Sequence, residues 1–486
     1  MQLKGYSQLI SFNKTYGHYE LLDGAASGCE IKGQGYVIDQ GVTLQTTDSG
    51  YINLLFTDYN GDSIYSKIFA ESNLALISYK IKQLKNNNLA LICFKRIANQ
   101  NDLTGYLYKL NMLGDTLFTK QLPTNYTRTL LNDFCETHEG GFIITGYAQN
   151  HVGNTLQQSQ LYIVKTDSLG NKLWDTLVGN NVDWEFGRGI VELADSSFVV
   201  AGYRYKAGNG TYEGISLKFD KNNKLIWNKK YNNGNSSFSG LLKLKSENII
   251  FYGGKLISVG PPADGDILMT KIDTGGNIIW SKTYGIGTLP DAAFCGVTTN
   301  LANDEYILAG ANNNLGQNKQ VGWFARFDSA GTAIHERGWA AVPMYHDVSN
   351  FNSVIQASDG GTVLFGWASV YDTAFGGYSQ DAWIVKLDSN GCDIDTCPNI
   401  VSSASIPQIG VNDGNYIRCV PNPTSGVFAI SPSIKIEQVQ IFNAMGAEVS
   451  FVKRDNEIDI SALATGLYYL RCSNGKKVYV AKVMKE

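Results

Sequence analysis

The stretch LYIVKTDSLGNKLWDTLVG, residues 161–179, decides the fold because the chain repeats its pattern seven times. An alternating apolar strand ends at Asp167, a short polar turn with Gly170 follows, and a second strand places Trp174 seven residues after the aspartate. The positions equivalent to Asp167 recur every 53 to 60 residues: Asp58, Asn111, Asp167, Asp220, Asp273, Asp328 and Asp388. A period of about 50 residues, with short strands and no helical periodicity, is typical of a β-propeller. We therefore expect an all-β fold with a seven-bladed propeller.

The two ends of the repeat region complement each other. SFNKTYG, residues 11–17, matches the second strand of the hairpin at residues 280–285 but has no first strand before it. The last copy, near Asp388, lacks its second strand. We expect residues 12–16 to pair with residues 383–387, so that the N-terminal strand becomes the outermost strand of the seventh blade and closes the ring. The predicted organisation is a propeller over residues 1–392, a linker over 393–416 and a small antiparallel β-sandwich over 417–486.

Composition excludes several classes of protein. Charged residues make up 17% of the 486, and the net charge of −4 provides no basic surface for nucleic acid, so no nucleic-acid partner is expected. No apolar run reaches the roughly 18 residues that a membrane-spanning helix needs, so no transmembrane segment is predicted. Glycine, at 51 residues, and aromatic residues, at 12%, suit a protein of strands and turns.

The repeated turn and aromatic positions each have two interpretations. An aspartate that bonds its own turn, beside a glycine of positive φ, explains the turn in every copy. Calcium in the loops at residues 58–62 or 388–395 is the less favoured alternative, and we expect no metal or other cofactor. The aromatic position is predicted to pack between blades, although regularly spaced tryptophans could also stack on sugars. Its members are Tyr65, Phe118, Trp174, Trp227 and Trp280, with His335 as the odd one.

One end of the blades is predicted to bind the ligand. The loops between second and third strands, and those between blades, are longer and more variable than the tight hairpins at the other end. Binding residues concentrate on loops held by a rigid scaffold. The candidate ligand contacts are Trp184, Tyr212, Tyr345 and Tyr371. The alternative is that these aromatic side chains only pack their own loops.

Residues 391–416 have no sustained periodicity and read as a linker. Cys392 and Cys397 lie in it without a second Cys or His pair that would complete a metal site. We therefore predict a small disulfide loop between them.

The last seventy residues alternate short strands with Gly, Pro and Asn. Their recognisable motif residues are Pro421, Asn422, Pro423, Gly426, Gly446, Asp459, Gly466, Tyr468, Lys482 and Lys485. This segment closely resembles the C-terminal type A sorting domain of the type IX secretion system of Bacteroidota, and the repeats before it resemble propellers of uncharacterised surface proteins. The resemblance implies transport through the outer membrane by the secretion machinery, removal of the domain by a sortase-like protease, and attachment to an anionic lipopolysaccharide or release. It also implies an export signal, which the N-terminus MQLKGYSQLI does not provide.

No catalytic motif is apparent. The sequence contains neither a GxSxG nor an HExxH pattern. Carboxylates on the predicted inter-blade loops, including Asp183, Glu185 and Asp291, could form a glycosidase or lyase pair, but nothing in the sequence fixes their separation. The favoured function is therefore a secreted or outer-membrane-attached propeller that binds a glycan or a protein, and catalytic residues are expected to be absent. A polysaccharide-degrading hydrolase or lyase and a structural surface-layer component are the alternatives.

Overall fold

The computed structural model describes the greater part of the chain: residues 11–17, 21–44, 50–71, 74–97, 102–152, 155–231, 234–258, 264–284, 297–301, 304–312, 320–339, 348–372, 377–389, 391, 418–422, 424–431, 438–443, 449–454, 457–473 and 478–485. The chain divides into two compact units, Met1–Ile406 and Pro407–Glu486. Every secondary-structure element named among the described residues is a strand, which confirms the all-β prediction. No described helix is long and apolar enough to span a membrane.

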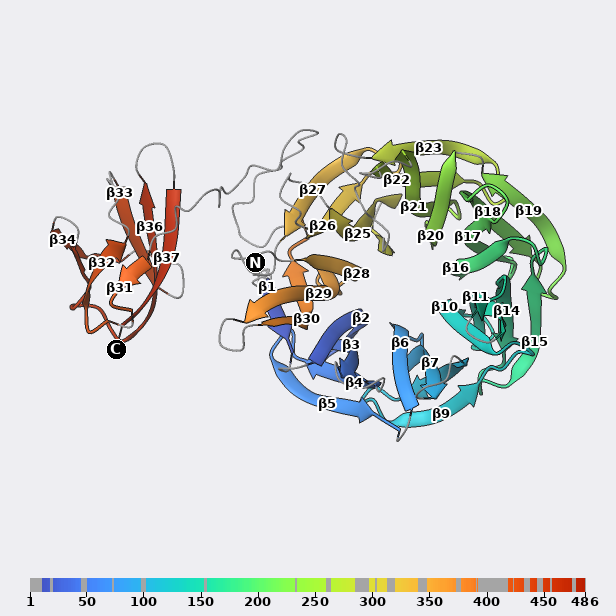
Figure 1. The fold of residues 1–486 in the computed structure, drawn as a ribbon, viewed down its shortest axis with the longest axis horizontal. Coiled ribbons are helices and arrows are strands. Elements are labelled where there is room, and N and C mark those ends of the chain that lie inside the picture. The colour runs from blue at the N-terminus through green and yellow to red at the C-terminus, as the bar shows by residue number, and fades with distance from the viewer. Residues whose placement is uncertain are drawn as a thin grey trace, which may run out of the picture. The chain divides into compact units, whose positions relative to one another are not determined.

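The first unit is a ring of seven four-stranded antiparallel blades, as predicted (Figure 1). The first three blades are formed by β2 (Leu21–Ile31), β3 (Gly35–Leu44), β4 (Gly50–Thr57) and β5 (Ser63–Phe69); β6 (Leu74–Gln83), β7 (Leu89–Ile97), β8 (Leu103–Leu110) and β9 (Thr116–Gln121); and β10 (Arg128–Glu136), β11 (Phe142–Gln149), β14 (Gln160–Thr166) and β15 (Lys172–Val178). A two-residue hairpin, β12 (His151–Val152) with β13 (Thr155–Leu156), lies in the loop between β11 and β14.

The remaining four blades continue the pattern. They are formed by β16 (Trp184–Glu192), β17 (Phe198–Lys206), β18 (Thr211–Phe219) and β19 (Leu225–Tyr231); β20 (Asn235–Lys243), β21 (Ile249–Ser258), β22 (Asp264–Ile272) and β23 (Ile278–Tyr284); β24 (Val297–Asn300), β25 (Tyr306–Asn312), β26 (Val321–Phe327) and β27 (Ala333–Trp339); and β28 (Ser349–Gln356), β29 (Thr362–Asp372), β30 (Gly377–Leu387) and β1 (Phe12–Tyr16). The labelled first strands β2, β6, β10, β16, β20 and β28 lie at the centre of the ring, and fourth strands such as β5, β9, β15, β19 and β23 lie on its circumference (Figure 1).

The N-terminal strand completes the seventh blade. β1 pairs antiparallel with β30, and Phe12 opposes Lys386 while Tyr16 opposes Ala382. The predicted pairing is confirmed, with a register one residue away from the expected one. The Tyr16 hydroxyl also donates to the carbonyl of Gly61 in the first blade. The ring is therefore closed by hydrogen bonds within the last blade and between the last blade and the first.

Removing residues 1–17 should lower the melting temperature and promote aggregation. The deletion exposes the backbone edge of β30 and removes the bond from Trp383 Nε1 to Asn13 Oδ1, which measures 2.6 Å. Differential scanning calorimetry and light scattering of the isolated propeller measure both effects. A deletion variant that stays monomeric and melts as the parent does would contradict the closure.

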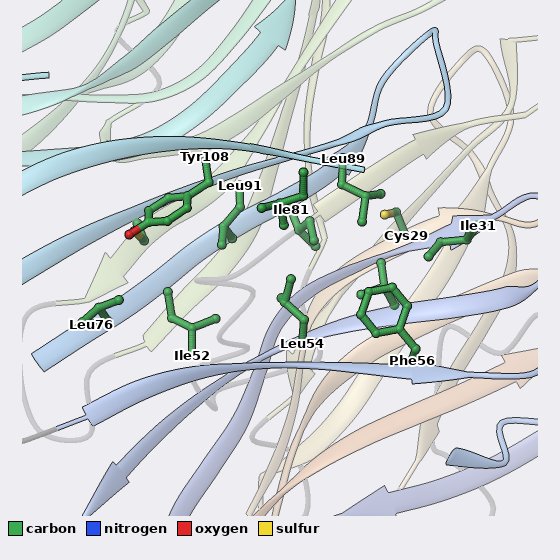
Figure 2. Packing of buried hydrophobic residues seen from close by; sticks show 13 residues of the cluster. Cys29, Ile31, Ile52, Leu54, Phe56, Leu76, Ile81, Leu89, Leu91 and Tyr108 are labelled. Carbon is green, nitrogen blue, oxygen red and sulfur yellow. The ribbon is translucent and has the colours of Figure 1, made fainter. Parts of the chain in front are cut away.

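Buried apolar side chains fill the spaces between neighbouring blades. Between the first two blades, Ile52, Leu54 and Phe56 of β4 contribute to one cluster with Leu76, Ile81, Leu89 and Leu91 of β6 and β7 (Figure 2). Strands that alternate inward and outward side chains provide such a surface on each side of a blade. Each blade is consequently stabilised by its neighbours rather than by a core of its own.

The repeated aromatic position packs between blades, which supports the packing interpretation over a sugar-stacking surface. A Cβ on Gly276, in the turn of the fifth blade, would lie 3.0 Å from the ring of Trp227 in the fourth. Trp174 stacks on Phe198 of the next blade, with ring centroids 5.8 Å apart. His335, which occupies the repeated aromatic position in the sixth blade, is buried beside Phe324.

Trp227→Ala should destabilise the propeller by about 3 kcal/mol. This value is near the lower end of the stability losses for truncation of a large aromatic side chain, because the ring is only half-buried. The matched control is Ile226→Ala, whose side chain is exposed on the same strand and should change little. Urea denaturation of both variants measures the difference. A Trp227 variant with unchanged stability and lost ligand binding would instead identify the ring as a binding platform.

The repeated aspartate stabilises its own turn. Asp58 Oδ1 accepts the backbone N–H of Asn60 and of Asp62, each at 2.8 Å. The same side-chain bonds recur at the equivalent positions Asn111, Asp167, Asp220, Asp273 and Asp328. Within the described ranges no group of three or more His, Cys, Asp or Glu is placed to hold a metal ion, and most of the second candidate calcium loop, residues 388–395, lies outside those ranges.

The second unit is a small sandwich of two antiparallel sheets, as predicted. One sheet has the order β31 (Arg418–Val420), β32 (Val427–Ser431), β35 (Glu457–Asp459) and β34 (Val452–Arg454). The other has the order β33 (Gln438–Asn443), β36 (Gly466–Ser473) and β37 (Val478–Lys485). Both sheets contribute to one buried cluster, which includes Phe428, Ile458, Ile441 and Leu470. This unit therefore has a hydrophobic core of its own.

Candidate ligand-binding face and sorting motif

The two predicted ligand contacts in the fourth blade lie on strands, not on loops. Trp184 is the first residue of β16, and Tyr212 lies in β18. The long loop expected between the second and third strands is wrong for this blade: β17 continues to Lys206 and β18 begins at Thr211, because cross-strand pairing extends to a short turn. Tyr371 likewise lies in β29, opposite Tyr378 of β30, and Tyr345 lies outside the described residues.

The register of the fourth blade places five aromatic residues on one face of its sheet. Trp184, Tyr205 and Tyr212 lie directly opposite one another on β16, β17 and β18. Phe186 opposes Tyr203 two residues further along. Because side chains alternate between the faces of a strand, all five project to the same side. We call Trp184, Phe186, Tyr203, Tyr205 and Tyr212 the aromatic face.

Four rings of the aromatic face, Phe186, Tyr203, Tyr205 and Tyr212, form a contiguous set of ring contacts. Tyr212 lies 5.1 Å from Tyr205 and 5.8 Å from Tyr203, between ring centroids. Phe186 lies 4.8 Å from Tyr203 and 4.8 Å from Tyr147, which belongs to β11 of the third blade. Tyr212 is exposed and the other four are half-buried. These contacts hold the rings in place while leaving part of the aromatic face open to solvent.

An arginine that the sequence analysis missed lies against this face. Arg188 occupies the bulge of β16 between Gly187 and Gly189. Its Nη1 donates to the hydroxyl of Tyr79 at 3.2 Å, and its Nη2 donates to that of Tyr203 at 3.0 Å. Tyr79 belongs to the second blade, 109 residues away in sequence. Burial opposes the charge of Arg188, but the two tyrosines outweigh it and raise the pKa of the guanidinium.

The opposite face of the same strands carries charged residues. Glu185, Arg204 and Glu213 form the cross-strand row next to the aromatic one. Arg204 Nε lies 3.1 Å from Glu185 Oε1 and 3.9 Å from Asp183 Oδ2. Burial raises the pKa of Glu185, while Arg204 opposes this shift. The structure thus brings together two of the carboxylates considered for catalysis, Asp183 and Glu185, but as partners of an arginine; Asp291 lies outside the described residues.

Hydrogen bonds of the motif residues join the beginning and the end of the second unit. Asn422 Oδ1 accepts the backbone N–H of Met484 at 2.8 Å, and Lys485 donates from Nζ to the Leu463 carbonyl at 2.6 Å. Gly426 has a φ of +144°, and a Cβ there would lie 2.4 Å from Ser461 Oγ. The buried Lys485 is therefore part of the fold rather than a free basic tail.

The other motif residues are described to different extents. The Tyr468 hydroxyl donates to the Ala464 carbonyl at 2.8 Å, and Asp459 Oδ1 accepts the N–H of Ser461 at 2.8 Å. Pro421 precedes Asn422 in a bend after β31, Gly466 opens β36, and Lys482 lies in β37 opposite Tyr469. Pro423 and Gly446 lie outside the described residues, and so do Cys392 and Cys397, so their predicted disulfide stays a prediction.

Residues 419–486 match the secretion system C-terminal sorting domain family. The sequence-based resemblance is confirmed over this segment, and it implies interaction with the type IX secretion system. The protein is accordingly secreted or attached to the outer-membrane surface. No curated protein matches the chain.

Solved structures resemble the chain only distantly. A protein of unknown function from Bacteroides caccae is 12% identical with a TM-score of 0.37, and the match covers 59% of this chain and 87% of that one. The K499G mutant of NanB sialidase from Streptococcus pneumoniae is 9% identical with a TM-score of 0.41, covering 79% and 71%. The α-L-arabinofuranosidase Arb93A from Fusarium graminearum is 10% identical with a TM-score of 0.41, covering 65% and 94%.

Proposed function

We propose that the propeller is an exported binding protein that takes a glycan on the aromatic face of its fourth blade. The observation that carries this proposal is the row of Trp184, Tyr205 and Tyr212, continued by Phe186 and Tyr203. The C–H faces of a pyranose ring pack on aromatic rings, and tyrosine hydroxyls bond the sugar hydroxyls around them. Phe186, Tyr203, Tyr205 and Tyr212 are already ordered by mutual ring contacts, so these side chains lose little entropy when a sugar binds.

The sorting domain directs this binding protein to the cell surface. In our proposal, the secretion machinery carries the chain across the outer membrane, and a sortase-like protease cuts between residues 398 and 416. The compact fold of residues 418–485, with its own core, supports its role as a separate address domain. The mature propeller is then attached to an anionic lipopolysaccharide or released.

The enzyme alternative is less favoured by the arrangement of carboxylates. Glu185 and Glu213 have nearly fully buried side chains, and both lie around Arg204. A glycosidase needs two carboxyl groups that reach the scissile bond from opposite sides. The charged row of the fourth blade instead forms an internal network that stiffens the strands beneath the aromatic face.

A glycan array probed with the purified propeller tests the proposal. We expect a restricted set of polysaccharides to bind, and Tyr212→Ala to lose at least about 10-fold in affinity because it removes the most exposed ring of the face. Ile226→Ala, on the outer strand of the same blade, is the matched control. Each polysaccharide that binds is then assayed for release of reducing sugar. Release of products would favour the enzyme, and binding of proteins but no glycan would contradict the proposal.

A further inference from the structure

Arg188 differs in its partners from two other arginines of the propeller, Arg204 and Arg326. Arg204 is bonded to Glu185, and Arg326 is bonded to Glu305. The bonds of Arg188 go only to the hydroxyls of Tyr79 and Tyr203, and among the described residues no carboxylate lies within ion-pair distance of it. A half-buried guanidinium thus lies beside the aromatic face without a counter-charge from any residue that the structure describes.

The surroundings keep this guanidinium charged and oriented. Its central carbon lies 5.7 Å from the ring centroid of Phe186 and 5.4 Å from that of Tyr203. A guanidinium has five N–H donors in a planar fork, and the bonds to described residues involve only Nη1 and Nη2. Aromatic rings and neutral hydroxyls stabilise a cation only partly when it is removed from water. An anion from outside the protein would neutralise this charge and accept hydrogen bonds from the remaining N–H donors.

The backbone around Arg188 is built for this position. Gly187 and Gly189 flank it at the bulge, where a Cβ on Gly187 would lie 2.1 Å from Thr145 Oγ1 and one on Gly189 would lie 2.8 Å from the backbone nitrogen of Leu241. The two glycines let β16 fit closely between the third and fifth blades. The bulge changes the direction in which the Arg188 side chain projects. Bonds to the second blade and within the fourth then fix its direction.

We propose that the glycan is acidic and that Arg188 binds the carboxylate of a uronic acid unit, while the neighbouring rings of the aromatic face pack on its sugar ring. The inference rests on the proposed function, because it assigns the ligand class of the same site. A planar carboxylate accepts two parallel hydrogen bonds from a guanidinium, which gives the pair both strength and orientation. The carboxyl carbon of a hexuronate is bonded directly to the sugar ring, so the anion and the stacking surface arrive together.

Isothermal titration of the purified propeller with galacturonic acid oligosaccharides tests this assignment. The matched ligand is the fully methyl-esterified oligosaccharide, which keeps the sugar ring but carries no charge. We expect the acid to bind about 10- to 100-fold more tightly than the ester, as for a charge-assisted bidentate pair. Arg188→Gln should abolish this preference, and Arg188→Lys should retain part of it because the charge remains but the fork is lost.

Three controls keep the test decisive. Lys230→Gln removes an exposed cation from the same blade and should leave the preference unchanged. Tyr79→Phe keeps the ring and deletes one hydroxyl that orients Arg188, so it should weaken binding of the acid more than of the ester. Thermal melting verifies that each variant is folded; if Arg188→Gln is not, the Tyr79→Phe and Arg188→Lys results decide.

The outcomes separate this inference from the proposed function. Equal affinity for acid and ester, unchanged in Arg188→Gln, would overturn the acidic class and leave glycan binding intact. Dextran sulfate bound as tightly as the uronate oligosaccharide, and lost in the same variants, would contradict the carboxylate assignment. Absence of binding to every glycan of the array would overturn both proposals.

Discussion

Cells that export the chain without residues 418–486 should retain a folded propeller in the periplasm, with surface delivery reduced to background. The reason is that the sorting domain occupies residues 419–486 and the ring is hydrogen-bonded without it. Proteinase accessibility on intact cells, followed by fractionation, measures delivery in a host with a type IX system. The full chain, expressed behind the same export signal, should appear at the surface with a C-terminus between residues 398 and 416.

Point variants separate loss of the domain from loss of its fold. Gly426→Val should also block delivery, because its φ of +144° and the close Ser461 exclude a branched side chain. Val452→Ala, at an exposed position of the same domain, should be delivered normally. Surface delivery of the truncated chain, or a mature protein that still ends at Glu486, would show that the domain is not the sorting signal.

Asp39→Asn should stabilise the propeller by up to about 4 kcal/mol above pH 7 and change little near pH 4. Asp39 lies on β3, is fully buried, and its Oδ1 has no hydrogen-bond partner among the described residues. Burial raises the pKa of this carboxyl to about 7, although the Ser78 and Ser27 hydroxyls oppose the shift. Asparagine has nearly the same shape and no charge to bury.

The direction of the pH dependence follows from proton binding. Between the unfolded pKa of about 4 and the folded pKa of about 7, only the folded state holds the proton on Asp39. The free energy of unfolding therefore falls as the pH rises through this window. Urea denaturation of wild type and Asp39→Asn from pH 4 to 8 measures the difference between their free energies of unfolding. The contributions of the other titrating groups cancel in this difference. Parallel curves across this range would contradict a raised pKa.

Asp133 provides a control of opposite sign. It is buried too, but Lys80 and Lys82 outweigh burial and lower its pKa to about 2. The stability that this carboxylate contributes is present above the unfolded pKa and is lost as the pH falls toward 2. Asp133→Asn should therefore destabilise the propeller by about 3 kcal/mol at neutral pH, since it leaves two lysines without their anion.

Local patterns were sufficient to predict the blades. The aspartate of each hairpin turn bonds its own backbone, so the turn is encoded within five residues and repeats wherever they repeat. The partner of β1 was also predictable, because a strand without a hairpin and a hairpin without a strand occur at opposite ends of the repeats. The end of β17 and the start of β18 were not predictable, because Tyr205 and Tyr212 continue the pairing through residues that resemble a loop.

The candidate site was only partly predictable, because it depends on strand register and on contacts between blades. Trp184 and Tyr212 were found from their places beside variable segments, but their row with Tyr205 depends on register. Arg188 meets Tyr79 only because the ring brings the second and fourth blades together, and no local pattern encodes that contact. The one available signal was its position between two glycines, which is unusual for the first strand of a blade.

Hydrogen–deuterium exchange of the isolated propeller, with and without the polysaccharide that binds most tightly on the array, tests the central claim most directly. The account predicts slower exchange on ligand binding in residues 184–192, 198–206 and 211–219 of the fourth blade and in the end of β11 beside Phe186. Exchange in the turns at the opposite end of the strands, such as residues 220–224, should not change. Protection confined to another blade, or to those turns, would contradict binding at the aromatic face.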